Sequence, residues 1–69
     1  MRMRYNSKIY SRAGVEEAVA AFTSVCTITL IEASGYITAE FSDIDPGLTE
    51  SLFDEFGNYA LYATIAGNK

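Results

Sequence analysis

The stretch Ile9–Leu30, IYSRAGVEEAVAAFTSVCTITL, decides the fold of this 69-residue chain. In its first half, apolar residues recur at steps of three and four from Val15 to Phe22, so they share one face of a helix. Ser11 precedes this helix and is a good N-cap. The second half is dense in β-branched residues, which predicts a buried strand over Val25–Glu32. The stretch therefore predicts a short amphipathic helix that leads directly into a strand.

Alternating residues on either side of this stretch predict two more strands. Residues Arg2–Ile9 alternate between polar and apolar side chains, which is typical of a strand with one buried face. Residues Tyr36–Phe41 alternate in the same way and follow the turn signal Ala33-Ser34-Gly35. Gly35 is expected to take a positive φ in this turn. The strand at residues 25–32 and the strand at 36–41 therefore form a hairpin.

A second helix is expected after a loop that contains Asp43 and Asp45. Asp45 before Pro46 fits an N-cap with proline at the first helical position, and Thr49 is an alternative cap. The core-facing stripe of this helix is predicted to comprise Leu48, Leu52, Phe53, Phe56, Tyr59, Ala60, Ala63 and Ile65. Gly57 is expected to weaken or kink this helix. Gly14, in the first helix, costs stability unless it allows another backbone to approach closely.

The order of the predicted elements, strand-helix-strand-strand-helix, favours one topology. Strands joined by a helix within one sheet run parallel, and the third strand can lie between them, antiparallel to its hairpin partner. The predicted fold is α+β: a βαββα two-layer sandwich with sheet order 1-3-2, a split βαβ, and both helices on one face. With 49% hydrophobic and 20% charged residues the composition is globular, and residues 1–69 are expected to form a single domain.

Composition and charge argue against several classes of protein. The single cysteine, Cys26, cannot form a disulfide within the chain, and the N-terminal residues lack a signal-peptide pattern. We therefore expect a cytoplasmic protein. No apolar run approaches the ~20 residues that a membrane span requires. We therefore expect no membrane partner. The net charge is −4, and binding to phosphates requires several clustered cations, so we expect no nucleic acid as a partner either.

The residue types offer little basis for catalysis. The chain has no histidine, and Cys26 lies in a β-branched run, where it reads as a packed small hydrophobe. Asp43 and Asp45 are spaced as D-x-D, but the other ligands of a calcium loop are missing, and turn formation and capping explain both residues. The glycines form no phosphate-cradling pattern. We therefore expect no catalytic, cofactor-binding or metal-binding residues, and no enzyme activity.

The uncovered face of the sheet is the expected contact surface. A domain of this size buries roughly 60% of its unfolded surface, so self-association as a homodimer or docking on a protein or peptide partner would supplement its marginal stability. The cations of the first strand can attract an acidic peptide, or they can protect an exposed edge strand from pairing. The predicted contact residues are Arg2, Arg4, Lys8, Tyr10, Ile31 and Tyr36.

A family resemblance adds a functional expectation. The residues that carry it are Ile9-Tyr10-Ser11, Val15, Ala18, Ala21-Phe22, the β-rich run after them and Gly35-Tyr36. This pattern resembles the HxsD-like family, named for the His-Xaa-Ser peptide-maturation system. The resemblance covers about Tyr5 to Phe41 and thins over the second helix, where family members carry more charge.

The resemblance implies a small non-catalytic accessory or adaptor protein that works beside radical S-adenosylmethionine enzymes on a ribosomally made peptide. It brings no catalytic residue and no cofactor. The alternative is a self-associating ferredoxin-like module that binds a small ligand at a dimer interface.

Overall fold

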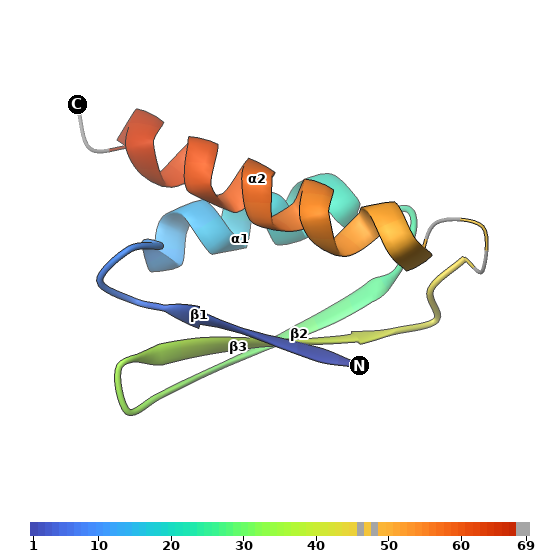
Figure 1. Ribbon diagram of the computed structural model, residues 1–69, viewed down its shortest axis with the longest axis horizontal. Coiled ribbons are helices and arrows are strands. Elements are labelled where there is room, and N and C mark those ends of the chain that lie inside the picture. The colour runs from blue at the N-terminus through green and yellow to red at the C-terminus, as the bar shows by residue number, and fades with distance from the viewer. Residues whose placement is uncertain (46, 48, 68–69) are drawn as a thin grey trace.

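The computed structural model describes residues 1–45, 47 and 49–67, which form two helices and a three-stranded sheet (Figure 1). The elements in chain order are β1 (Arg2–Asn6), α1 (Arg12–Phe22), β2 (Thr27–Ala33), β3 (Tyr36–Ser42) and α2 (Thr49–Gly67). The sheet order is β1-β3-β2, and both pairings are antiparallel. The predicted α+β fold and the 1-3-2 order are confirmed, and Figure 1 shows both helices on the same side of the sheet.

The first strand is shorter than its alternating pattern predicts. β1 ends at Asn6 rather than Ile9, because Asn6 accepts hydrogen bonds from the backbone N–H groups of residues that follow it. Its carbonyl oxygen accepts from the N–H of Ile9 (3.0 Å) and of Tyr10 (2.9 Å), and its side-chain oxygen accepts from the N–H of Lys8 (2.9 Å). These bonds fold residues 7–10 into a turn. Asparagine commonly captures nearby backbone groups in this way.

Helix α1 begins as predicted. The hydroxyl of Ser11 accepts a hydrogen bond from the N–H of Gly14 at 2.9 Å, which satisfies one of the unpaired donors of the first turn. Val15 and Ala18 are fully buried on the face that the three- and four-residue spacing selects. The predicted helix, its cap and its buried face are therefore confirmed.

Gly14 lies against the backbone of α2. A methyl group on Gly14 would overlap the hydroxyl of Thr64 and would lie 2.7 Å from the Thr64 nitrogen and 2.8 Å from the Ala60 oxygen. The Thr64 hydroxyl accepts from the N–H of Ser11 (3.0 Å) and donates to the carbonyl of Ala60 (2.8 Å). The start of α1 and the C-terminal half of α2 are thus held together by a close approach and by hydrogen bonds.

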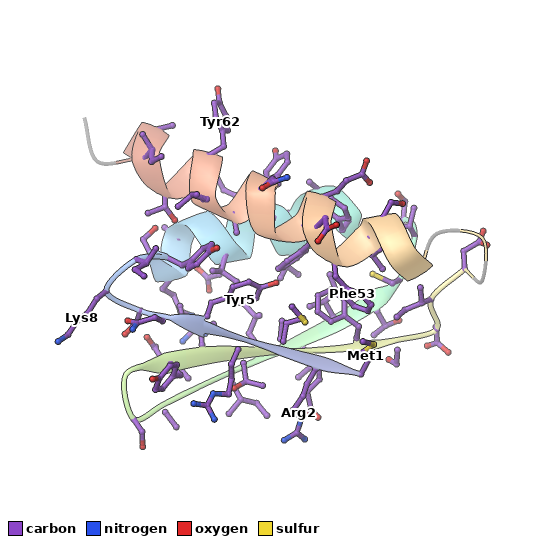
Figure 2. The ribbon with its side chains drawn as sticks, viewed as in Figure 1. Met1, Arg2, Tyr5, Lys8, Phe53 and Tyr62 are labelled. Carbon is purple, nitrogen blue, oxygen red and sulfur yellow. The ribbon has the colours of Figure 1, made fainter. Side chains whose placement is uncertain are left out.

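The core centres on Phe56, which is fully buried between the two layers. Its ring centroid lies 5.9 Å from that of Tyr5 in β1, 5.5 Å from that of Phe22 in α1 and 5.1 Å from that of Phe41 in β3. These distances are typical of tilted and edge-to-face aromatic pairs. Tyr5 and Phe53 point into the space between helices and sheet (Figure 2).

Two predictions about the α2 stripe are wrong. Tyr59 is 42% exposed and Ile65 is 60% exposed, although both were expected to face the core. The buried residues of the helix are Leu52, Phe56, Ala60, Ala63 and Thr64, so Tyr59 and Ile65 lie at or beyond the margins of that stripe. The helix continues through Gly57 to Gly67. Pro46 and Leu48, expected in its cap and its stripe, lie outside the described residues.

Candidate functional site

The face of the sheet that points away from the helices brings together four of the six predicted contact residues. Alternation places Arg2 and Arg4 of β1, Tyr36 of β3 and Ile31 of β2 on this face, because Met3, Tyr5 and Ile37 point the other way into the core. Figure 2 shows Arg2 directed away from the helical layer. We call this surface the open face.

Arg4 and Tyr36 form the centre of the open face. The guanidinium carbon of Arg4 lies 4.3 Å from the centroid of the Tyr36 ring, a cation–π contact between neighbouring strands. Tyr36 is 37% exposed, so the stack still presents an aromatic ring and a cation to solvent. Among the described residues, Arg4 has no carboxylate within ion-pair distance. Arg4 therefore remains available to an external anionic group.

Arg2, in contrast, has a partner within the sheet. It stands directly opposite Glu40 of β3, and its guanidinium lies 2.9 Å from the Glu40 carboxylate. Both side chains are exposed, so this pair contributes at most about 1 kcal/mol to stability. A stronger acceptor from a partner can displace Glu40 at low cost.

Ile31 supplies the apolar part of the open face. It stands opposite Thr38 of β3, and Thr38 stands opposite Arg4, so one rung of the sheet carries an isoleucine, a threonine and an arginine. Ile31 is 48% exposed. The rung offers both apolar and cationic contacts across three strands.

Within the described residues, one side of the β1 backbone has no hydrogen-bond partner. The carbonyl of Met1 accepts from the N–H of Phe41 (2.6 Å), and the N–H of Ser7 donates to the carbonyl of Gly35 (3.0 Å). In an antiparallel ladder alternate residues turn their N–H and C=O groups toward the same neighbour, so residues 1, 3, 5 and 7 face β3. The N–H and C=O groups of Arg2 and Arg4 therefore point away from β3, toward the free edge.

Two of the predicted contact residues lie elsewhere. Lys8 is in the turn after β1, where its side chain extends from the end of the sheet (Figure 2). Tyr10 is half-buried against the core, with its ring centroid 4.9 Å from that of Tyr5. Both positions follow from the early end of β1 at Asn6, which turns residues 7–10 out of the strand.

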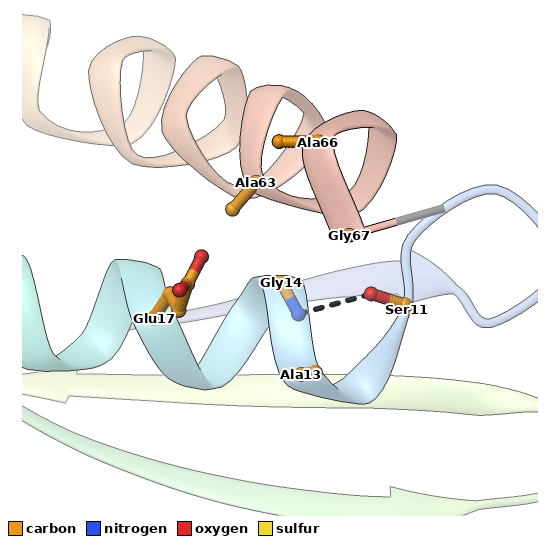
Figure 3. Close-up of a pocket in the computed structure, with 7 residues that line it drawn as sticks. All are labelled: Ser11, Ala13, Gly14, Glu17, Ala63, Ala66 and Gly67. Carbon is orange, nitrogen blue, oxygen red and sulfur yellow. Dashed lines mark hydrogen bonds between the residues drawn. The ribbon is translucent and has the colours of Figure 1, made fainter. Parts of the chain in front are cut away.

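A pocket of about 340 Å³ lies between the start of α1 and the end of α2 (Figure 3). Its lining is Ser11, Ala13, Gly14, Glu17, Ala63, Ala66 and Gly67. The one hydroxyl in this lining is already engaged, since Ser11 accepts from the N–H of Gly14 (2.9 Å) and donates to Thr64 (3.3 Å). The pocket therefore offers small apolar groups and a carboxylate at Glu17, with little to orient a ligand.

The candidate metal ligands Asp43 and Asp45 form structural contacts. The carboxylate of Asp43 accepts from the hydroxyl of Thr27 (3.3 Å), and that of Asp45 accepts from the N–H of Gly47 (3.0 Å), so both aspartates hold the loop. Within residues 1–45, 47 and 49–67, no group of three or more Cys, Asp or Glu side chains is placed to hold a metal ion. Burial raises the pKa of the Cys26 thiol, which disfavours the reactive thiolate at neutral pH.

A second exposed cluster was partly missed by the sequence reasoning. Tyr59, Tyr62 and Ile65 lie three residues apart on α2 and are all exposed, Tyr62 the most at 71%. Tyr62 points away from the sheet (Figure 2), and the other two residues were assigned to the core-facing stripe. Spacing alone does not distinguish the margin of a buried stripe from its centre.

No helix in the described parts of the chain combines the length and the apolar character needed to cross a membrane. Searches of protein-family models, curated proteins and solved structures gave no significant match to the chain.

Proposed function

We propose that the chain is a small non-catalytic accessory or adaptor module that binds an extended segment of a partner protein or peptide. The observation that carries this proposal is the stacked pair Arg4–Tyr36 on the open face, beside a strand edge whose backbone groups have no partner in the described part of the chain. An added strand would pair with the backbone of β1 and place every second side chain on the open face.

The charges of β1 favour an acidic partner segment. A strand paired with β1 has alternate side chains beside Arg2 and Arg4. A carboxylate there would meet the Arg4 guanidinium, which has no acidic partner among the described residues, and the Arg2 guanidinium, which forms only an exposed ion pair. Opposite charges facing one another across strands contribute about 0.2–1 kcal/mol per pair. The expected partner motif therefore alternates acidic residues with β-branched ones.

The resemblance to the HxsD-like family supports a specific setting for this activity. In that setting the partner is a ribosomally made precursor peptide or the radical S-adenosylmethionine enzyme that modifies it. Genes for such an enzyme and for a peptide rich in His-Xaa-Ser beside the gene of this chain would support the setting. Failure of the chain to bind that enzyme or that peptide would contradict it.

The adaptor activity itself can be tested by nuclear magnetic resonance. Isotope-labelled protein is titrated with a synthetic peptide that alternates glutamate with valine and threonine, and with the same peptide carrying lysine in place of glutamate. We expect the acidic peptide alone to shift the amide signals of Arg2, Arg4 and Tyr36. The shifts should weaken several-fold in Arg4→Gln and persist in Arg12→Gln, which removes a cation from α1 instead. Equal binding of both peptides, or shifts confined to the helices, would refute the proposal.

A further inference from the structure

The two edges of the sheet differ in how they are protected. β1 carries Arg2 and Arg4 on its exposed side, and charged residues on an edge strand discourage unwanted pairing. The other edge is β2, in which residues 27–31 read TITLI, without charge, proline or glycine. An uncharged, β-branched edge of this kind is a template for pairing with another strand.

The register identifies the backbone groups that β2 presents at its edge. Phe41 exchanges hydrogen bonds with Met1 on the β1 side, so Glu40 and Ser42 turn their backbone groups toward β2. Their partners Thr29 and Thr27 therefore face β3. The N–H and C=O groups of the intervening residues, Ile28 and Leu30, point to the free edge of β2.

The side chains at this edge are incompletely covered. Ile28 and Leu30 point to the helical side but are only partly buried, at the margin of the core. Ile31 is 48% exposed on the open face. A strand added beside β2 would cover apolar groups on both faces of the sheet at once.

We propose that β2 pairs antiparallel with β2 of a second copy of the chain, about a two-fold axis that passes beside Thr29. This register sets Ile28 against Leu30 of the second copy in hydrogen-bonded positions, and Thr27 against Ile31. Every paired residue is uncharged. Glu32 falls outside the paired segment, and its carboxylate is held by Arg12 of its own chain at 2.8 Å.

The alternative pairings of two copies are less favourable. Joining two β1 edges would bring Arg2 and Arg4 of both chains together, and like charges across strands are destabilising. Joining β1 to β2 of the next copy gives a head-to-tail contact, which leaves a free edge at each end of a pair and extends to larger assemblies, as a ring or a filament. The β2–β2 pairing closes after two copies and leaves β1 at both outer edges, so it is independent of the peptide-binding proposal.

The size of the contact sets the expected affinity. Stable interfaces bury about 1,200–2,000 Å² in total, and two paired segments of five residues belong at or below the low end of that range. We therefore expect a dissociation constant of the dimer in the micromolar range. A test of the dimer must cover low- to high-micromolar concentrations of the chain.

Sedimentation of the full chain tests the proposal directly. The apparent mass is expected to rise with concentration from 7.6 kDa toward twice that value. Thr29→Lys places two ammonium groups beside the axis and should keep the mass at 7.6 kDa at every concentration. Ser42→Lys is the matched control, because it adds the same charge to the same face one strand farther from the edge. It should dimerise like the wild type.

Cross-linking provides a second readout that does not depend on destabilising the dimer. Thr29 would face its own copy at a non-hydrogen-bonded position, where the Cα atoms of paired residues lie about 4.5 Å apart, within reach of a disulfide. Thr29→Cys with oxidised glutathione as the oxidant should therefore form a disulfide-linked dimer, while Ser42→Cys should not. A monomeric wild type, a Thr29→Lys dimer or equal cross-linking of the two cysteine variants would overturn the proposal.

Discussion

The backbone nitrogen of Thr64 in α2 lies only 2.7 Å from the position that a Cβ atom on Gly14 in α1 would occupy. The hydroxyl of the same threonine accepts from the backbone N–H of Ser11, the residue that caps α1. The place where α1 begins and the place where α2 crosses it are therefore fixed by the same few atoms.

Gly14→Ala should be strongly destabilising. Alanine improves helix propensity by about 1 kcal/mol, but the added methyl meets backbone atoms that cannot move without separating the helices. We expect a net loss of about 2 kcal/mol in the free energy of unfolding, measured by urea denaturation followed by circular dichroism.

Gly57→Ala is the matched control for that substitution. Its added methyl would lie 3.9 Å from the Tyr5 ring, an ordinary van der Waals contact, so the propensity gain should appear as about 0.5–1 kcal/mol of added stability. If both alanine variants lose stability equally, close helix approach is not the role of Gly14.

Thr64→Val should distinguish the contribution of the hydroxyl to stability from that of the side-chain volume. Valine keeps the volume but leaves the part-buried N–H of Ser11 without its acceptor, which should cost about 1–2 kcal/mol of unfolding free energy. Thr64→Ser keeps the hydroxyl and loses one methyl group. A Ser variant less stable than the Val variant would show that packing, and not hydrogen bonding, dominates at this position.

Tyr5→Phe should stabilise the protein at neutral pH. The Tyr5 side chain is buried, and no polar atom of the described residues forms a hydrogen bond with its hydroxyl. Removing a buried, unpaired hydroxyl should raise the free energy of unfolding by about 1 kcal/mol. A loss of stability would indicate that the hydroxyl has a partner, such as a bound water.

The same tyrosine predicts how stability depends on alkaline pH. Burial, with a smaller contribution from Tyr10, raises the pKa of Tyr5 to about 12 from its ordinary 10.0. Between these values the unfolded chain releases this proton and the folded chain keeps it, so stability falls as pH rises. The wild type should lose about 2 kcal/mol between pH 10 and 12 through this residue. Unfolding curves of Tyr5→Phe should show a shallower fall over the same range.

Ser34→Asn should stabilise the β2–β3 hairpin. Ser34 and Gly35 have φ values of 55° and 80°, as in a type I′ turn, and asparagine tolerates the first of these positions better than serine. We expect a gain of about 0.5 kcal/mol in thermal or urea unfolding. Gly35→Ala places a Cβ on the positive-φ glycine and should lower stability; a gain there would contradict the turn assignment.

Much of the fold could be predicted because its signals are local. The cap at Ser11, the buried face through Val15 and Ala18, and the alternation around Ile37 each depend on residues a few positions apart. Strand order followed from these elements and from the rules of strand connection.

Features that depend on distant residues were not predictable in the same way. The sequence suggested that Gly14 allows a close approach, but the partner, Thr64, lies 50 positions away and reads as an ordinary helix residue. The open face was predicted in part: Arg4, Tyr36 and Ile31 meet there, while Tyr10 packs against Tyr5. Tyr10 lies away from the open face because Asn6 accepts hydrogen bonds from the residues after it, and these bonds compete with continuation of the strand.

The central position of β3 has a consequence for synthesis on the ribosome. β1 and β2 each pair with β3 and not with each other. No part of the sheet can therefore form before β3, which ends at Ser42, has emerged. The hydrogen bond that ties the start of α1 to α2 forms later still, because the hydroxyl that accepts from the Ser11 N–H belongs to Thr64. The sheet and the contact between α1 and α2 therefore form only after these residues have been made, and until Ser42 has emerged the TITLI segment of β2 has no complete partner strand in its own chain.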